Sequence, residues 1–298
     1  MAYLHFFLAL VAIIAVQAVQ LPNLSKVEPK IDALPNNLPW KAALKARNAL
    51  VKKNDESRII GGSFAQAGQF PYQAAIFIDN QEFCGGSIIS SNWILTAGHC
   101  GYQAQSFVVI LGSLTIQNGD PSQVVIQSYQ GITHPYFDMN SLQNDLSLIM
   151  LPQQIPMSPY ISPIQLSSTE VGGGQMATVS GWGKTSDDSQ ISPDLKYTNL
   201  VTMENSECEQ YYGGMVYNGD ICCTGNEGTT CQGDSGGPLV INGVQIGIVS
   251  FGGQSCLQSP PVFTRVAGFI PWISQVEECK DPDNGQEPKV ALESWIQD

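Results

Sequence analysis

The sequence predicts an all-β fold that ends in a helix. From Phe70 onward the chain consists of short apolar or alternating runs separated by glycine, asparagine, aspartate and proline, a pattern typical of short strands joined by tight turns. The runs form two series, and two barrels or two sandwiches would both account for them. Near the end, Phe269, Trp272, Ile273 and Val276 fall at helical spacing, which predicts one amphipathic helix that closes the domain.

The two series give the positions of the expected strands. The first series has runs at residues 73–78, 87–90, 107–111, 124–129 and 146–151. The second has runs at residues 175–180, 195–203, 238–241 and 244–251. Turn-forming residues bound these runs, as expected where many short strands follow one another.

The first 18 residues are predicted to be a signal peptide. The stretch from Leu4 to Val19 is apolar apart from His5 and Gln17, and it closes on small residues at Ala18, which is typical of a cleaved export signal. This run is too short, and too uncharged at its flanks, for a membrane anchor. We therefore expect a secreted, extracellular protein with no membrane partner.

Residues 19–58 are interpreted as a pro-segment, with a plain linker as the alternative. They are rich in proline and lysine, lack strand alternation, and end at Arg58, directly before Ile59-Ile60-Gly61-Gly62. A basic residue in this position is a good protease cleavage site, and a cut there would create a new N-terminus at Ile59. At the other end of the chain, residues 280–298 are acidic and contain proline and glycine near their start, so we expect a solvated tail.

Charge and cysteine content narrow the class of protein. The whole chain has a formal net charge of −13. Eight basic and four acidic residues precede Ile59, which leaves five basic and 22 acidic residues, a net −17, for the remainder. Such an acidic protein is not expected to bind nucleic acid or anionic membranes. Eight cysteines and only three histidines in an exported chain indicate disulfides rather than a zinc cluster.

One loop combines a hydroxyl nucleophile with glycines and a carboxylate. Residues 231–237 read Cys-Gln-Gly-Asp-Ser-Gly-Gly and lead through Pro238 into an apolar run. The glycines free the backbone, so that the N–H groups of Gly233 and Ser235 could point into one hollow. A serine that attacks a carbonyl needs such donors for the charge that develops on oxygen. A glycine-rich surface turn is the alternative for this motif alone.

A nucleophilic serine also needs a base and an orienting carboxylate. Among the three histidines, His99 lies at the end of the apolar run that starts at Trp93, directly before Cys100. Asp145 leads into another apolar run, where an unpaired buried carboxylate would be unfavourable. Each residue alone is a weak signal, but the order His99, Asp145, Ser235 in three such contexts is a much stronger one.

With these motifs, the sequence resembles the chymotrypsin-family serine proteases of the trypsin type. The resemblance covers residues 59–279, interpreted as the catalytic domain, and its motifs are IIGG from Ile59, LTAGHC ending at Cys100, NDLSLI around Asp145, GWG at 181–183, CQGDSGGPL around Ser235 and IVSFG at 248–252. It implies two six-stranded antiparallel Greek-key barrels with the active site in the cleft between them. It also implies that His99 is the general base, that Asp145 orients it, that Ser235 attacks, and that the N–H groups of Gly233 and Ser235 bind the oxyanion.

The resemblance further implies disulfides and an activation step. The implied pairs are Cys84–Cys100, Cys208–Cys222 and Cys231–Cys256. Cys223 and Cys279 have no standard partners, so they could bond each other, pair between molecules or stay free, and adjacent Cys222 and Cys223 leave the assignment of Cys208 open. Cleavage of Arg58–Ile59 would place the Ile59 ammonium beside Asp234.

The specificity pocket is expected to be neutral. Thr229 stands where trypsin-like members carry an aspartate, and Ser250, Phe251 and Gly252 are expected to form the pocket wall. A neutral base favours large apolar or aromatic substrate side chains, whereas Pro260-Pro261 would narrow the pocket and favour an elastase-like preference. Because the stretch 111–119 lacks the carboxylates of the family's calcium loop, we expect no metal, and we expect no cofactor.

The expected function is that of a monomeric serine endopeptidase, made as a zymogen and switched on by a trypsin-like protease. Its partners would be protein or peptide substrates. Only five basic residues follow Arg58, which would suit a digestive fluid rich in trypsins. The rival interpretations are a catalytically silent homologue that binds a partner and a disulfide-rich structural protein.

Overall fold

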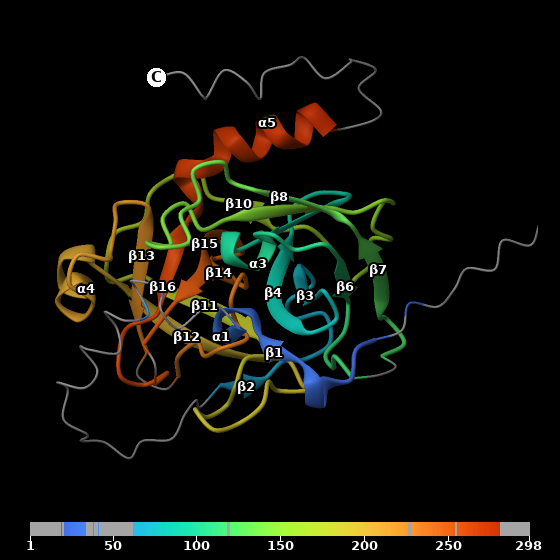
Figure 1. The fold of residues 1–298 in the computed structure, drawn as a ribbon, viewed down its shortest axis with the longest axis horizontal. Coiled ribbons are helices and arrows are strands. Elements are labelled where there is room, and N and C mark those ends of the chain that lie inside the picture. The colour runs from blue at the N-terminus through green and yellow to red at the C-terminus, as the bar shows by residue number, and fades with distance from the viewer. Residues whose placement is uncertain are drawn as a thin grey trace, which may run out of the picture.

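The computed structural model describes residue 19 and residues 21–33, 38, 41, 62–117, 120–225, 228–253 and 255–280 (Figure 1). The predicted signal peptide, the Arg58–Ile59 bond and the tail beyond Lys280 lie outside these residues. No helix in the described ranges is long and apolar enough to cross a membrane.

Along the chain, most elements are strands, with a few short helices between them. In the first half these are η1 (Leu24–Lys26), β1 (Glu28–Pro29), α1 (Lys30–Ala33), β2 (Ser63–Phe64), β3 (Gln73–Ile78), β4 (Glu82–Ile88), β5 (Trp93–Thr96), α3 (Gly98–Gly101), β6 (Phe107–Leu111), β7 (Val124–Ser128), β8 (Gln130–Thr133) and β9 (Ser147–Met150). In the second half they are β10 (Gln165–Leu166), β11 (Met176–Gly181), β12 (Lys196–Met203), α4 (Asn205–Tyr212), β13 (Asp220–Thr224), β14 (Pro238–Ile241), β15 (Val244–Phe251), β16 (Val262–Arg265), η2 (Val266–Phe269) and α5 (Ile270–Lys280).

The first sheet curls into a barrel. Its strands follow the order β7-β6-β3-β4-β5-β9-β8, and neighbours on this path are antiparallel. Only Tyr129 separates the two end strands β7 and β8, so they are halves of one bent strand and the ring has six members. Side chains from this ring, among them Ile76, Leu95 and Val109, form a fully buried core.

The second sheet closes by hydrogen bonds. Its path runs β15-β14-β11-β12-β13-β16, and β16 pairs with β15 to complete a ring of six antiparallel strands. Its core includes Val179, Leu200 and Phe263. The two barrels lie side by side, with the C-terminal helix α5 across one end (Figure 1). The prediction of an all-β fold with two barrels and a closing helix is confirmed.

One strand is longer than the sequence pattern indicates. β4 begins at Glu82, whereas the apolar run that predicts it begins at Ser87. The earlier part contains Gly85 and Gly86, which weaken any strand pattern. The structure shows why Gly86 is needed, because a Cβ there would lie 2.7 Å from Ile76 Cδ1 and 3.0 Å from Ile94 Cγ2. The barrel wall is too tightly packed at this point for a side chain.

Candidate active site

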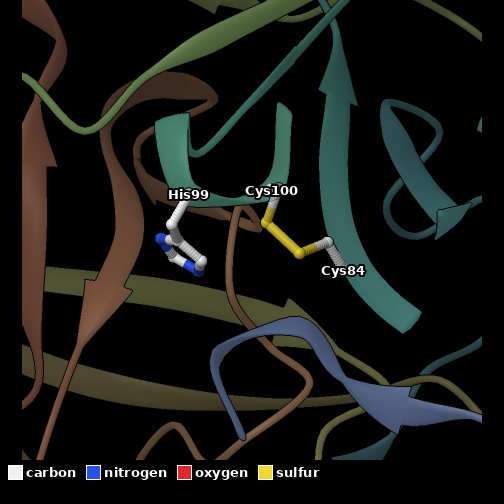
Figure 2. Close-up of side chains that lie close together, drawn as sticks. All are labelled: Cys84, His99 and Cys100. Atoms are coloured by element: carbon white, nitrogen blue, oxygen red, sulfur yellow. A yellow bond between two sulfur atoms is a disulfide. The ribbon is translucent and has the colours of Figure 1, made fainter. Parts of the chain in front are cut away.

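The base and its carboxylate come from neighbouring strands of the first barrel. β5 and β9 are paired with Thr96 opposite Ser147, so the residues that follow β5 meet those that precede β9. His99 lies in α3, and its Nδ1 is 2.8 Å from Asp145 Oδ2. Both side chains are completely buried. The Cys84–Cys100 disulfide ties β4 to α3 directly beside His99 (Figure 2).

Asp145 is surrounded by hydrogen-bond donors. The backbone N–H of His99 donates to Oδ1 at 2.7 Å, and the Ser250 hydroxyl donates to Oδ2 at 2.5 Å. Thr264 donates to the backbone carbonyl of Asp145 at 2.9 Å. Donors to a carboxylate stabilise its charged form. A charged Asp145 keeps the proton of His99 on Nδ1 and leaves Nε2 free to accept one.

The nucleophile loop packs on β4 and on the residues directly before His99. The backbone N–H of Gly85 donates to the Ser235 carbonyl at 2.7 Å. Gly236 packs so closely on the segment before His99 that a Cβ would lie 2.2 Å from Thr96 Oγ1. Its φ of +81° also favours glycine. Ser235 is buried, and His99 Nε2 is a buried nitrogen without a hydrogen-bond partner in the described part of the chain.

Two backbone donors of this loop are left without backbone acceptors. The N–H groups of Asp234, Gly236 and Gly237 are bonded at 3.0, 2.8 and 2.9 Å. Those of Gly233 and Ser235 donate to no carbonyl within the described residues. Lys184 N–H donates to the Gln232 carbonyl at 2.8 Å and so fixes the orientation of the Gln232–Gly233 peptide. Preplaced donors of this kind stabilise an oxyanion.

Asp234 occupies a separate, enclosed position behind the loop. Its carboxylate accepts from Gly183 N–H at 2.8 Å and from Cys231 N–H at 3.0 Å. Burial raises its pKa to about 6. Asp234, Gly183 and Gly62 line one cavity of about 40 Å³. A volume of this size holds one small polar group.

A cavity of about 580 Å³ adjoins Ser235. Thr229 lines it, and within the described residues the Thr229 hydroxyl is buried without a hydrogen-bond partner. A Cβ on Gly252 would meet nothing within 4 Å, so this wall leaves open space. Among the lining residues that the structure describes, Asp32 and Lys41 carry the only charged side chains, and both come from the segment before Ile59. The other described lining residues are uncharged and mix polar with apolar groups.

Comparisons with known proteins agree with this geometry. The family model described as Trypsin matches residues 59–273. The chain belongs to the trypsin family. Brachyurin of Leptuca pugilator is 42% identical over 220 residues, which cover 72% of this chain and 96% of that protein. The collagenase of Hypoderma lineatum is 40% identical, over 74% of this chain and 87% of that protein. Kallikrein-8 of Homo sapiens is 35% identical, also over 74% and 87%. The protein is a serine endopeptidase.

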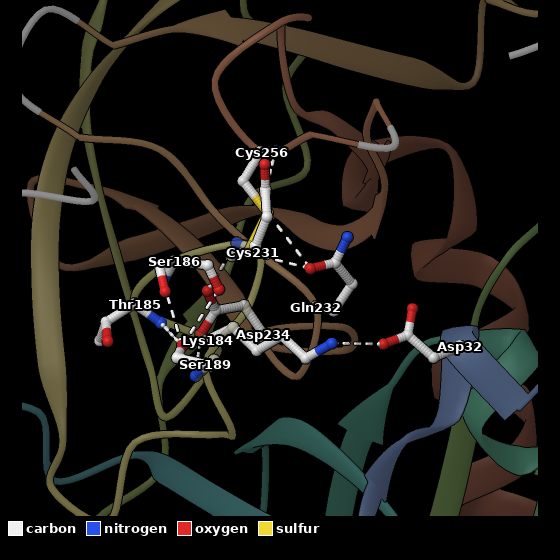
Figure 3. The surroundings of a disulfide bond; sticks show 11 residues. Asp32, Lys184, Thr185, Ser186, Ser189, Cys231, Gln232, Asp234 and Cys256 are labelled. Atoms are coloured by element: carbon white, nitrogen blue, oxygen red, sulfur yellow. Dashed lines mark hydrogen bonds and ion pairs between the residues drawn. A yellow bond between two sulfur atoms is a disulfide. The ribbon is translucent and has the colours of Figure 1, made fainter. Parts of the chain in front are cut away.

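Three disulfides stabilise the protease, and they are the pairs that the resemblance implies. Besides Cys84–Cys100, the structure contains Cys208–Cys222 and Cys231–Cys256. The last of these joins the nucleophile loop to the pocket wall (Figure 3). Cys223 is free and buried, and burial raises its pKa to about 12, whereas Cys279 is free and exposed.

Two groups of side chains in the described part of the protease come close enough together to hold a metal ion, but neither is suited to do so. They are Cys84 with His99 and Cys100, and Asp187 with Cys231 and Cys256. Each group contains both sulfurs of a disulfide, and metal binding requires thiolates.

The sequence missed several groups at the site of the protease. Ser250 was expected on the pocket wall; it lines the pocket, and its hydroxyl also contacts Asp145. The donors to Asp234 are backbone N–H groups, which no side-chain pattern reveals. Nothing in the sequence predicts that Asp32 and Lys41 line the pocket, because the segment that carries them lacks a recognisable motif.

Proposed function

We propose that this chain is a secreted zymogen whose mature form hydrolyses peptide bonds through Ser235, His99 and Asp145. The observation that carries the proposal is the buried His99–Asp145 pair, together with the packing of the Ser235 loop on the residues directly before His99. Ser235 Oγ would attack the substrate carbonyl while His99 Nε2 takes its proton. His99 would then return the proton to the leaving amine, and water would hydrolyse the acyl-enzyme by the same steps.

The two unused N–H groups suit the charge that this reaction creates. As the carbonyl carbon becomes tetrahedral, its oxygen becomes negative and would accept from Gly233 and Ser235. Donors fixed before the reaction need no reorganisation at the transition state. Asp145 would keep the imidazole in the required tautomer and stabilise the imidazolium that forms.

We further propose cleavage after large apolar or aromatic residues. Thr229 offers no charge to an arginine or lysine side chain, and the described lining residues that follow Arg58 are all uncharged. An unpaired cation would therefore lose its hydration without compensation. Open space beside Gly252 favours a large substrate side chain. Pro261 also lines the pocket, and a pocket that it narrows would favour the elastase-like alternative.

Activation by cleavage of Arg58–Ile59 is the third part of the proposal. Gly62 lies three residues after Ile59 and lines the cavity that contains Asp234. Three residues span at most about 10 Å, so a new N-terminal ammonium could enter that cavity. An opposite charge there would lower the raised pKa of Asp234 and stabilise the loop that holds Gly233 and Ser235.

Secretion, a monomeric state and a digestive setting stay part of this proposal. The signal-like first 18 residues and the disulfides support secretion, and the scarcity of basic residues after Arg58 supports the digestive setting.

The proposal is tested by treating the secreted precursor with an arginine-specific protease and measuring labelling by a fluorophosphonate probe. Labelling should appear only after cleavage and should be lost in Ser235→Ala. A peptide library should then be cut after Phe, Tyr or Leu and not after Arg or Lys. Cleaved protein that stays unlabelled would establish the silent homologue instead, and cutting confined to Ala or Val would establish the elastase-like preference.

A further inference from the structure

The segment before Ile59 forms a strand beside the nucleophile. β1 pairs with the beginning of β4 in parallel, with Glu28 opposite Glu82 and Pro29 opposite Phe83. Glu28 N–H donates to the Gln81 carbonyl at 2.8 Å. Three residues after Glu82, the same strand β4 bonds to the Ser235 carbonyl. The segment therefore adds a strand to the edge of the first barrel next to the catalytic serine.

Apolar and charged contacts hold this segment on the domain. Val27 and Pro29 are buried, and Leu21 and Leu24 pack with Val27 on the cluster that contains Phe83 and Trp182. Burial of these side chains provides a non-directional attraction.

Two ion pairs flank the apolar contacts. Lys30 pairs with Glu82, and Asp32 Oδ2 lies 2.9 Å from Lys184 Nζ (Figure 3). The pairs join opposite charges on either side of the cleft. The first pair follows the overall balance of charge, since the segment before Ile59 is basic and the rest of the chain is strongly acidic, whereas in the second pair the segment supplies the acid.

Beyond β1 the segment enters the specificity pocket. Helix α1 contacts α3, and the blue ribbon of β1 and α1 passes close to His99 in Figure 2. Ile31 and Asp32 line the same cavity as Ser235 and Thr229. Residues 28–32 thus cross the site from β4 to the pocket.

The direction of this crossing is opposite to that of a substrate. In a substrate, the side chain that fills the pocket belongs to the residue before the scissile bond, and the chain continues away from the pocket toward the leaving group. The segment instead reaches the pocket after it has passed β4. We expect a segment that runs in this direction not to align its peptide bonds with Ser235 and the oxyanion donors, and cleavage needs aligned reacting groups.

We propose that residues 21–33 are a built-in competitive inhibitor that occupies the cleft in the non-productive direction. This inference rests on the proposed function, since it concerns access to the same site. It adds a second control to the cleavage at Arg58: cutting that bond would form the site, but substrates would enter only once the segment dissociates. The occupant is this chain's own segment, and the bound peptide is not a substrate.

The test uses precursor processed by an arginine-specific protease, which leaves the segment intact up to Arg47. After the segment has been separated, a synthetic peptide of residues 19–33 is added back. It should inhibit hydrolysis of a Phe-containing substrate competitively and remain uncut between residues 28 and 33. Lys30→Glu should weaken inhibition about tenfold, whereas Lys26→Glu, the same change at an exposed lysine, should alter it less than about twofold. Glu82→Lys in the enzyme should restore inhibition by the Lys30→Glu peptide.

Binding of the labelled peptide to processed Ser235→Ala, measured by fluorescence anisotropy, separates the two proposals. Hydrolysis by the wild-type enzyme with no peptide binding would overturn this inference and leave the proposed function intact. Binding that an uncut Phe-containing peptide fails to displace would also overturn it, as would cleavage within residues 28–33. Peptide binding to a protein that hydrolyses nothing would overturn the proposed function and, with it, the inhibitory role.

Discussion

The two sides of the candidate active site are built differently. On the side of the first barrel, both oxygens of Asp145 accept hydrogen bonds and His99 is held through Nδ1. On the side of the second barrel, the N–H groups of Gly233 and Ser235 lack backbone acceptors and Asp234 has a raised pKa. The first side thus has its hydrogen bonds in place. By the proposed activation, the second side would still need a substrate oxygen and a positive charge, so control of the enzyme could act on the second side without disturbing the first.

The largest effect is expected when either reacting group, one from each side of the site, is removed. Ser235→Ala and His99→Ala should each lower kcat by about 10⁶, and the double variant should be little worse, because the residual rate comes from the oxyanion donors and binding. Steady-state kinetics of the processed variants would measure this. Losses that multiply in the double variant would show that the two sides act independently.

Asp234→Asn tests the second side alone. The variant should be cleaved at Arg58 as readily as the wild type, yet its kcat should fall about 10²–10³-fold, the loss expected when oxyanion donors are no longer held in place. Asp187→Asn is the matched control. The Asp187 carboxylate is exposed, accepts a hydrogen bond from Cys256 N–H, and does not line the cavity that contains Asp234. Wild-type kcat in Asp234→Asn would show that the loop forms without the carboxylate.

The pH dependence of the uncleaved precursor sharpens the same point. Because the folded pKa of Asp234 is raised from 3.8 to about 6, its contribution to stability is fully present below pH 4 and is lost as the pH rises through 6. We therefore compare the double variant Arg58→Gln/Asp234→Asn with Arg58→Gln alone. As the pH rises from 4 to 7, the free energy of unfolding of the double variant should increase relative to that of Arg58→Gln, by up to about 3 kcal/mol. Urea unfolding at several pH values measures the difference, and Asp220, whose burial raises its pKa to about 7, titrates in both proteins and cancels. A difference independent of pH would contradict the raised pKa.

The smallest expected effect is on the first side. Ser250→Ala removes one donor from Asp145, and a hydrogen bond to a charged group contributes about 1.5–3 kcal/mol, so kcat should fall roughly tenfold or more. Ser87→Ala is the control, because this buried hydroxyl bonds Gln245 at 2.7 Å, away from the triad. Equal losses in both variants would mean that the effect is one of packing.

Much of this architecture follows from local patterns. Runs such as β3, β6, β14 and β15 are bounded by turn residues, so the apolar pattern gives their limits. The strand pattern of β4 is interrupted by its glycines, and that of β16 is hidden by the prolines that precede it. The motifs around His99, Asp145 and Ser235 give the candidate residues, but the sequence says nothing of backbone donors or of long-range contacts. Lys30 and Glu82 are 52 residues apart, and no periodicity connects them.

Strand β13 carries a free thiol directly beside a disulfide. Successive residues of a strand face opposite sides, and here Ile221 and Cys223 point into the core of the second barrel while Cys222 faces the cluster that contains Tyr212 of α4. To bond Cys208, Cys223 would have to exchange faces with Cys222, which would turn Ile221 outward as well. The packing of the second barrel therefore favours the Cys208–Cys222 pair over Cys208–Cys223, so wrong bonds formed during oxidation would need only to be reopened for the barrel to select the right pair.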